Sequence, residues 1–235
     1  METRCAMPAS QPVQTESILI PLDSEAALQG DLGIPPGARG MVIFAHGSGS
    51  SRHSPRNRYI AQELQQAGLA TLLFDLLTAE EEQLDDYTRQ YRFDIGLLAE
   101  RLVASSDWLA LNPLTRPLEQ AYFGASTGAA AALVAAAQQP ARVRAVVSRG
   151  GRPDLAGDAL EKVRAPTLLI VGGWDVEVLR LNQQAFERLT CTKKLVVVPG
   201  ATHLFEEPGK LEEVARLARD WFAQHLGVAK GADHA

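Results

Sequence analysis

The stretch that decides the fold is Gly-Ala-Ser-Thr-Gly at residues 124–128. It lies between an apolar run at residues 120–123 that is typical of a strand and an alanine-rich run at residues 129–137 that is typical of a helix. The pattern G-x-S-x-G at such a junction is the signature of a nucleophile elbow, a sharp turn that exposes a serine hydroxyl. The glycines leave room for the backbone that crosses the turn. Ser126 is therefore the candidate nucleophile.

Two further catalytic candidates follow in the order that this motif requires. Residues 166–171 are predicted to form a buried strand that leads to Asp175, and residues 195–198 form another that leads to His203. Ligands of α/β sheets bind at the carboxyl ends of the strands, where both loops would lie. The chain order serine, acid, histidine is that of α/β-hydrolase triads. We therefore expect these two residues to form a catalytic triad with Ser126.

Asp154 is the alternative acid, because it also follows a predicted strand, at residues 143–147. Its Pro-Asp-Leu setting is more typical of a helix start, where an aspartate at the N-cap accepts hydrogen bonds from backbone amides. Asp175 has no such competing explanation beyond an ordinary turn, so we assign the acid to Asp175.

The glycine-rich loop at residues 46–51 (His-Gly-Ser-Gly-Ser-Ser) follows a predicted strand at residues 40–45. Acyl transfer needs two backbone N–H groups for the oxyanion, one from the residue after the nucleophile and one from such a loop. We assign them to Thr127 and Ser48. The loop matches neither the phosphate-binding G-x-x-x-x-G-K-[ST] pattern nor the dinucleotide fingerprint. His46 is expected to have a structural role at the loop base.

Together these motifs resemble the α/β-hydrolase superfamily, and the small size and missing lid are similar to its dienelactone-hydrolase-like branch. The stretches HGSGSSRHSPRN (residues 46–57) and SRGGRPDL (residues 148–155) also resemble a bacterial subgroup of that branch. The resemblance covers about residues 16 to 226. It implies an α/β-hydrolase fold with a mostly parallel eight-stranded sheet, flanking helices and no or minimal lid. Dienelactone hydrolases proper have a cysteine nucleophile where this chain has Ser126, so the resemblance implies a serine esterase rather than the dienelactone substrate.

Strand and helix patterns alternate along the chain after an antiparallel pair at residues 15–32. The predicted helices include residues 58–67, residues 127–138 and a last helix at residues 206–225. Such alternation predicts right-handed crossovers and a mostly parallel sheet. We expect one domain over residues 15–227, with an N-terminal tail at residues 1–14 and a C-terminal tail at residues 228–235.

The composition excludes several classes of function. A net charge of −5 over 235 residues does not favour a nucleic-acid partner. The two cysteines, Cys5 and Cys191, form no disulfide framework or metal-binding spacing, which favours a reducing cytoplasm. Residues 1–14 lack the apolar core of a signal peptide, and the longest apolar run, residues 128–137, is too short to span a bilayer. We expect a cytoplasmic enzyme without membrane partner, metal or cofactor; the oligomeric state is left open.

Charged residues gather at the predicted catalytic edge. The acidic run at residues 80–86 is expected to be a solvated loop or helix start rather than a cation site. Guanidinium groups suit carboxylates and phosphates. We predict that at least one of four arginines that follow the strands binds the substrate and gives the enzyme a preference for esters or lactones that carry a carboxylate. The alternative is that these arginines are surface charges or form salt bridges. The four arginines are Arg149, Arg152, Arg52 and Arg56.

The sequence therefore predicts a serine hydrolase that cleaves a small soluble ester or lactone through an acyl-enzyme. Only about 18 residues separate Val147 from Pro166, so there is no room for a large lid and the site should be open. Three alternatives remain. They are an amidase or peptidase with the same triad, an acyltransferase with the same triad, and a non-catalytic binding protein on a hydrolase scaffold.

Overall fold

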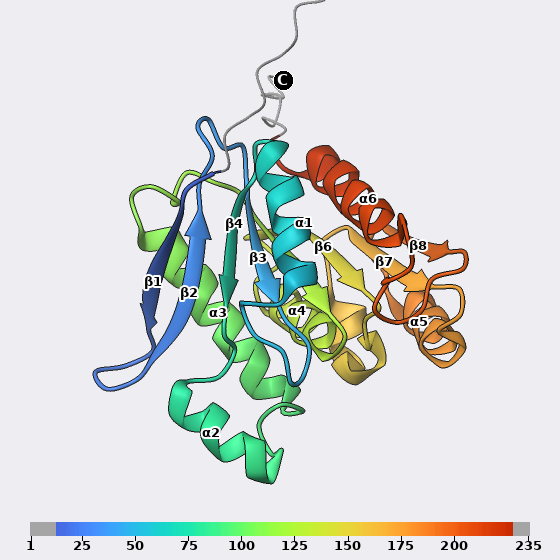
Figure 1. Cartoon of the computed structure of the whole chain (residues 1–235), viewed down its shortest axis with the longest axis horizontal. Coiled ribbons are helices and arrows are strands. Elements are labelled where there is room, and N and C mark those ends of the chain that lie inside the picture. The colour runs from blue at the N-terminus through green and yellow to red at the C-terminus, as the bar shows by residue number, and fades with distance from the viewer. Residues whose placement is uncertain (1–12, 228–235) are drawn as a thin grey trace, which may run out of the picture.

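The computed structural model describes residues 13–227, which form one eight-stranded sheet with helices on both faces (Figure 1). The tails predicted at residues 1–14 and 228–235 lie outside the described residues, apart from residues 13 and 14. The strands are β1 (Thr15–Pro21), β2 (Ala27–Gly33), β3 (Met41–Ala45), β4 (Ala70–Phe74), β5 (Gln120–Ala125), β6 (Val143–Arg149), β7 (Thr167–Gly172) and β8 (Lys193–Val198).

The order across the sheet is β1-β2-β4-β3-β5-β6-β7-β8. β1 pairs antiparallel with β2, and β2 pairs antiparallel with β4, whereas the remaining neighbours are parallel. Every residue of β3, β4, β5 and β7 is buried, as expected for parallel strands that are covered on both faces. The predicted mostly parallel, eight-stranded α/β-hydrolase fold is confirmed.

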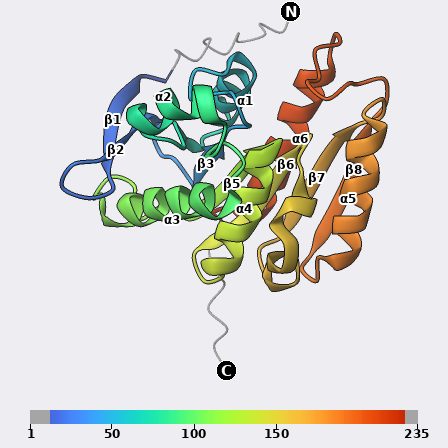
Figure 2. The same cartoon turned by 90° about the horizontal axis from the view of Figure 1, so that it is seen from below.

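Two layers of helices cover the sheet. Figure 2 shows α1 and α6 on one face and α3, α4, η1 and α5 on the other. The bounds of the helices are α1 (Pro55–Gln66), α2 (Ala79–Thr88), α3 (Ile95–Leu111), α4 (Thr127–Gln138), η1 (Pro153–Lys162), α5 (Val176–Arg188) and α6 (Lys210–His225).

Alternate side chains of the central strands enter two separate apolar cores. Phe44 and Phe123 point toward α1 and α6, with their ring centroids 4.9 Å apart. Their neighbours Ile43 and Tyr122 belong to the core under α3 and α4. Both cores are closed, so the exposed carboxyl ends of the strands are the part of the sheet that can carry chemistry.

Two helices begin at positions that differ from the predicted ones. α1 begins at Pro55 instead of Arg58, because the side chain of Ser54 accepts a hydrogen bond from the amide of Asn57 and proline suits the first helical position. α6 begins at Lys210 instead of residue 206, after Gly209 with a φ of 78°.

The acidic run lies within α2, which stands apart from the covering helices beyond the carboxyl ends of β3 and β4 (Figure 1). A capping box starts it: the Thr78 side chain accepts from the amide of Glu81, and the Glu81 side chain accepts from the amide of Thr78. The prediction of a helix start is confirmed here. Over residues 13–227, the helices lack the combination of length and apolar character that crossing a bilayer requires.

Candidate active site

Ser126 occupies the tip of the turn between β5 and α4. Its backbone has φ 51° and ψ −123°, a conformation that L-residues rarely adopt and that costs about 1–3 kcal/mol. A Cβ on Gly124 would lie 2.4 Å from Cα of Ala129, and a Cβ on Gly128 would lie 2.3 Å from the carbonyl oxygen of Ala45. Only glycine fits at both places, so the turn has the geometry of a nucleophile elbow.

The acid and the histidine predicted from the sequence are in contact. Nδ1 of His203 lies 2.6 Å from Oδ2 of Asp175. Asp175 occupies the N-cap position of α5, but its side chain makes no capping hydrogen bond, so the carboxylate is turned to the imidazole instead. Because a carboxylate accepts, Nδ1 carries the proton and Nε2 is left as the basic nitrogen. The two loops are pressed together at Gly172, where a Cβ would lie 2.4 Å from the carbonyl oxygen of Ala201.

The serine turn and the histidine loop rest on the same end of β6. The amide of Ser126 donates to the carbonyl oxygen of Arg149 at 3.3 Å. A Cβ on the next residue, Gly150, would lie 3.0 Å from the carbonyl oxygen and 3.5 Å from Nδ1 of His203. Among residues 13–227, Oγ of Ser126 forms no hydrogen bond with the His203 ring; such bonds often tighten only when substrate binds.

The two residues predicted for the oxyanion hole are joined by a hydrogen bond. The amide of Ser48 donates to Oγ1 of Thr127 at 2.9 Å. Thr127 is the first residue of α4, where backbone N–H groups have no intrahelical acceptor. The glycine-rich loop also touches the nucleophile, since a Cβ on Gly47 would lie 3.0 Å from Cβ of Ser126. The loop is therefore in position for an oxyanion hole, with one of its two amides bound to a hydroxyl.

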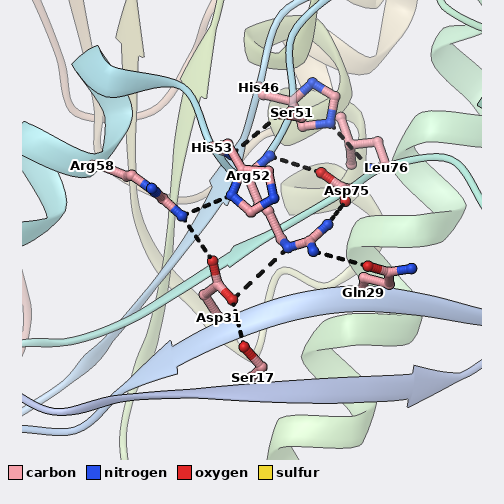
Figure 3. Close-up of polar contacts among 10 residues, drawn as sticks. All are labelled: Ser17, Gln29, Asp31, His46, Ser51, Arg52, His53, Arg58, Asp75 and Leu76. Carbon is pink, nitrogen blue, oxygen red and sulfur yellow. Dashed lines mark hydrogen bonds and ion pairs between the residues drawn. The ribbon is translucent and has the colours of Figure 1, made fainter.

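His46 fixes the base of the glycine-rich loop. Its Nε2 accepts from the amide of Leu76 at 3.1 Å (Figure 3). Its Nδ1 lies 2.9 Å from the carbonyl oxygen of Gly47. An accepting Nε2 requires the proton on Nδ1, which then donates to Gly47. Burial lowers the pKa of the imidazole. The ring is thus neutral and structural, as expected from the sequence.

Arg52 is the centre of a polar network under the same loop (Figure 3). Its guanidinium pairs with Asp75, and its own amide donates to Oδ1 of Asp75 at 2.7 Å. Nη2 donates to Oε1 of Gln29 at 2.8 Å, and Nε lies 3.8 Å from Oδ1 of Asp31. Asp31 also pairs with Arg58, at 3.5 Å. Nε itself forms no hydrogen bond within the described residues, and the other contacts of Arg52 hold the loop to β2 and to the end of β4.

Two more of the predicted substrate-binding arginines have carboxylate partners. Nε and Nη2 of Arg152 donate to the two oxygens of Asp154 at 2.9 and 2.8 Å, and this hydrogen bonding raises the pKa of Arg152. Arg56 pairs with Glu206 at 3.0 Å. The N-cap of η1 is Arg152, so the expectation that Asp154 takes that position is wrong; Pro153 fits the first helical position and sets the start.

Arg149, the last residue of β6, has different surroundings. It is 7% exposed. Its Nη2 donates to Oδ1 of Asn57 at a long 3.4 Å, while Nε and Nη1 are buried without a partner among the described residues. Burial, with a contribution from the positive charge of Arg56, lowers the pKa of Arg149 to about 10. The guanidinium is still charged at neutral pH.

A small cavity of about 100 Å³ lies between the glycine-rich loop and α2. Its lining includes Gly47, Ser48, Leu76, Glu82, Asp85 and Arg92. The buried carboxylate of Asp85 accepts from Nε of Arg92 at 2.5 Å and from the amide of Tyr91 at 2.7 Å. Burial raises the pKa of Asp85, but these hydrogen bonds outweigh it and hold the pKa below its ordinary value.

The Asp85–Arg92 pair was not foreseen from the sequence. The Thr-Ala-Glu-Glu pattern at residues 78–81, which matches a capping box, is the signal that could have located α2. No comparable signal marks Asp85 as the one buried member of an acidic run.

A larger hollow of about 740 Å³ lies between β1, β2 and α1. Its lining includes Asp31, Pro35, Arg58, Gln62 and Gln65. The predicted triad residues line neither this hollow nor the smaller cavity. The smaller cavity is the one that adjoins the glycine-rich loop, so it is the better candidate for the substrate.

The model of the dienelactone hydrolase family matches residues 28–227. The crystal structure of a dienelactone hydrolase from Anabaena variabilis ATCC 29413 is 61% identical in sequence, with a TM-score of 0.90, and the match covers 92% of this chain and 100% of that one. Est1E from Butyrivibrio proteoclasticus is 16% identical, with a TM-score of 0.74 and coverage of 88% of this chain and 98% of that one. At that identity the likeness shows the fold alone.

Two relatives from Mycobacterium tuberculosis, strains CDC 1551 / Oshkosh and H37Rv, are 59% identical over 218 residues. They carry the provisional name phosphoribosyl transferase. The match covers 93% of this chain but 48% of each relative, so the chain spans about half the length of the curated relatives it matches.

Proposed function

The chain belongs to the dienelactone hydrolase family, and from that premise we propose that it is a serine hydrolase that cleaves a small soluble ester or lactone through an acyl-enzyme. The observation that carries the proposal is the 2.6 Å contact between Nδ1 of His203 and Oδ2 of Asp175, beside a serine in elbow geometry. A serine activated by such a pair is the arrangement that acyl transfer requires.

In the first half-reaction, Nε2 of His203 takes the proton of Ser126 while Oγ attacks the substrate carbonyl carbon. Asp175 holds the imidazole in the correct tautomer and stabilises the imidazolium. The amide of Thr127 binds the oxyanion, and the amide of Ser48 exchanges its bond to the threonine hydroxyl for a bond to the oxyanion. His203 then protonates the leaving alcohol, and the acyl group stays on the serine.

In the second half-reaction, water takes the place of the alcohol. Nε2 of His203 accepts a proton from this water as its oxygen attacks the acyl carbon, and the same two amides bind the second oxyanion. Collapse of this intermediate returns the proton to Ser126 and releases the carboxylic acid. The triad supplies nucleophile, base and acid to both steps, so we propose no metal or cofactor.

The proposed substrate is small. The cavity of about 100 Å³ beside the glycine-rich loop is far below the roughly 300–1,000 Å³ of drug-sized sites. Because Ser126 stands where dienelactone hydrolases proper have a cysteine, we do not carry the dienelactone substrate over to this chain.

A panel of 4-nitrophenyl esters of graded acyl length tests the proposal, with Ser126→Ala as the blank. Turnover that falls with acyl length and disappears in the variant is the expected result. Labelling of Ser126 by a fluorophosphonate probe provides a readout that does not depend on the substrate chosen. Failure of the wild-type protein to label would favour a non-catalytic binding protein on this scaffold.

The two other catalytic alternatives use the same triad. They differ from an esterase in the leaving group of the substrate or in the molecule that accepts the acyl group. An amidase or peptidase would hydrolyse an amide at a rate close to that of the matched ester. An acyltransferase would pass the acyl group to an added alcohol or thiol in preference to water, which product analysis would detect. We favour ester hydrolysis over amide hydrolysis because an alcohol is a better leaving group than an amine.

The name of the mycobacterial relatives points to a different activity. Those proteins are about twice as long as this chain, whereas residues 28–227 match the hydrolase family. We therefore do not extend phosphoribosyl transfer to this chain.

We further propose that the enzyme acts on a dissolved small molecule in the cytoplasm, without a nucleic-acid or membrane partner. Cys191 is a free thiol in the described residues, which agrees with a reducing compartment. Fractionation of cells that express the protein, followed by detection in the soluble cytoplasmic fraction, tests this placement.

A further inference from the structure

Arg149 carries a buried positive charge that the described part of the chain does not neutralise. Among residues 13–227, no carboxylate lies within ion-pair distance of its guanidinium. The side chain is directed at the first turn of α1, where Nη2 meets Oδ1 of Asn57, itself 2% exposed. Nε and Nη1 have no partner in the described residues. A buried charge without a partner is unfavourable, and an anion from outside would supply the missing partner.

The surroundings of Arg149 are positive as well. Arg56 lies in the first turn of α1, and after burial its charge is the next cause that lowers the pKa of Arg149. Nε of Arg56 is also buried without a partner in the described residues. The first turn of α1 contains no acidic residue, unlike those of α2 and α6, so the partial positive charge of the helix N-terminus is not offset there.

We propose that Arg149, Arg56, Asn57 and the first turn of α1 bind the phosphate group of a phosphorylated ester substrate. The proposal rests on the function proposed above. Two guanidinium groups and three unpartnered nitrogen donors match a dianion with three terminal oxygens. A carboxylate brings one charge and two oxygens and would leave part of this set without a partner. A helix N-terminus favours phosphate for the same reason.

The subsite lies next to the nucleophile. Arg149 pairs with Ala125 across β5 and β6, one residue before Ser126. Neighbouring strands are about 4.8 Å apart, so the backbone of Arg149 lies beside that of the residue that precedes the nucleophile. The substrate is therefore one whose ester carbonyl and phosphate are separated by a short chain.

Arg56, one of the two arginines of this subsite, forms an ion pair with Glu206. The side chains are 30% and 62% exposed, and exposed ion pairs contribute little to stability. A substrate phosphate can therefore replace Glu206 as the partner of Arg56. Arg152 offers no such opening, because both oxygens of Asp154 already bind its guanidinium.

Three matched substrates test the proposal: the 4-nitrophenyl esters of 4-(phosphonooxy)butanoic acid, glutaric acid and glutaramic acid. Their acyl chains are similar and end in a phosphate, a carboxylate or a neutral amide. With Ser126→Ala as the blank for spontaneous hydrolysis, we expect kcat/KM for the phosphate ester to exceed both others by about ten- to a hundredfold. Arg149→Met should abolish this preference, chiefly through KM, whereas the control variant Arg152→Met should retain it.

Binding of inorganic phosphate tests the subsite without any turnover. Phosphate should raise the midpoint of thermal unfolding of the wild-type protein and of Ser126→Ala alike, and it should not do so for Arg149→Met. If Arg149→Met does not fold, Arg149→Lys keeps the charge without the fork and should show a weaker response to phosphate. A positive result in Ser126→Ala supports the subsite even if the esterase proposal fails.

Two outcomes would overturn the proposal. One is equal kcat/KM for the three esters together with no response of the unfolding midpoint to phosphate. The other is a preference for the carboxylate ester that equals or exceeds that for the phosphate ester, which would make the site one for carboxylates.

Discussion

Arg52 and Arg149 lie at the same edge of the sheet, yet their surroundings are opposite. Arg52 pairs with Asp75, lies near Asp31 and donates to Gln29, and its side chain is 18% exposed. Arg149 is more deeply buried and has one long hydrogen bond, to Asn57. Nε of each arginine lacks a hydrogen-bond partner among the described residues, but that of Arg52 lies 3.8 Å from a carboxylate oxygen of Asp31, whereas Arg149 has no carboxylate within ion-pair distance there.

The difference teaches that burial alone does not separate a structural arginine from one that binds a ligand. What separates them is whether the fold provides the countercharge. Arg52 received its carboxylates from β2 and from the end of β4, while the positions around Arg149 are filled by Asn57 and Arg56.

The largest effect, on kcat, is expected when the proposed nucleophile is removed. Ser126→Ala removes Oγ, and kcat on a 4-nitrophenyl ester should fall by roughly 10⁶-fold, because only the oxyanion hole and binding remain. Thermal unfolding of the variant should be close to that of the wild type. Substantial residual turnover in the purified variant would move the chemistry away from this edge of the sheet.

Asp175 and Asp154 provide a similar comparison between two carboxylates, one assigned to the triad and the other bound to an arginine. Asp175→Asn should lower kcat by roughly 10⁴-fold with little change in KM, because an amide favours the wrong tautomer of His203. Asp154→Asn is the matched control, and it should have a mild effect because its partner is Arg152. Steady-state kinetics of both variants would reveal an exchange of roles, which would place the acid after β6.

Replacement of each arginine by methionine tests the contrast directly through stability. Arg52→Met leaves Asp75 without its cation and Asp31 with Arg58 alone, and it should lower the free energy of unfolding by about 3 kcal/mol. Arg149→Met removes a charge that has no partner and should leave the free energy within about 1 kcal/mol of the wild type, or raise it. Urea unfolding in phosphate-free buffer gives both values. Equal losses in the two variants would mean that Arg149 has a structural partner after all.

The smallest effect concerns Arg92, whose ion pair with Asp85 should make stability depend on pH. Its pair with Asp85 holds the pKa of that carboxyl below the ordinary 3.8, so the unfolded chain binds the proton first as pH falls. The stabilisation is complete above the unfolded value and is lost as pH falls through the lower folded value. The difference in unfolding free energy between wild type and Asp85→Asn should therefore shrink between about pH 6 and about pH 3. A constant difference would show that the ion pair does not contribute.

Much of the fold could be predicted because its signals are local. The helix expected at residues 127–138 has those bounds, since the glycine turn and the alanine run define both ends. The contact between Asp175 and His203 could be anticipated because the elbow motif prescribes the order of its partners along the chain.

The partners of the arginines could not be predicted in the same way. Arg52 and Asp75 are 23 residues apart, and their pairing depends on how β3 and β4 are aligned rather than on any neighbouring residue. The sequence therefore presents Arg52 and Arg149 as equivalent. The hydrogen bond between Ser48 and Thr127 spans 79 residues and escapes prediction for the same reason.

That hydrogen bond has a consequence for the cost of catalysis. It ties the loop after β3 to the first residue of α4, so the two amides proposed for the oxyanion are held at a fixed separation before any substrate arrives. The entropy of ordering the loop is therefore lost when the chain folds, and in each catalytic cycle the Ser48 amide has only to exchange the threonine hydroxyl for the oxyanion as its acceptor. A loop with the same amides but without this tether would have to become ordered at the moment of reaction, and the barrier would rise accordingly.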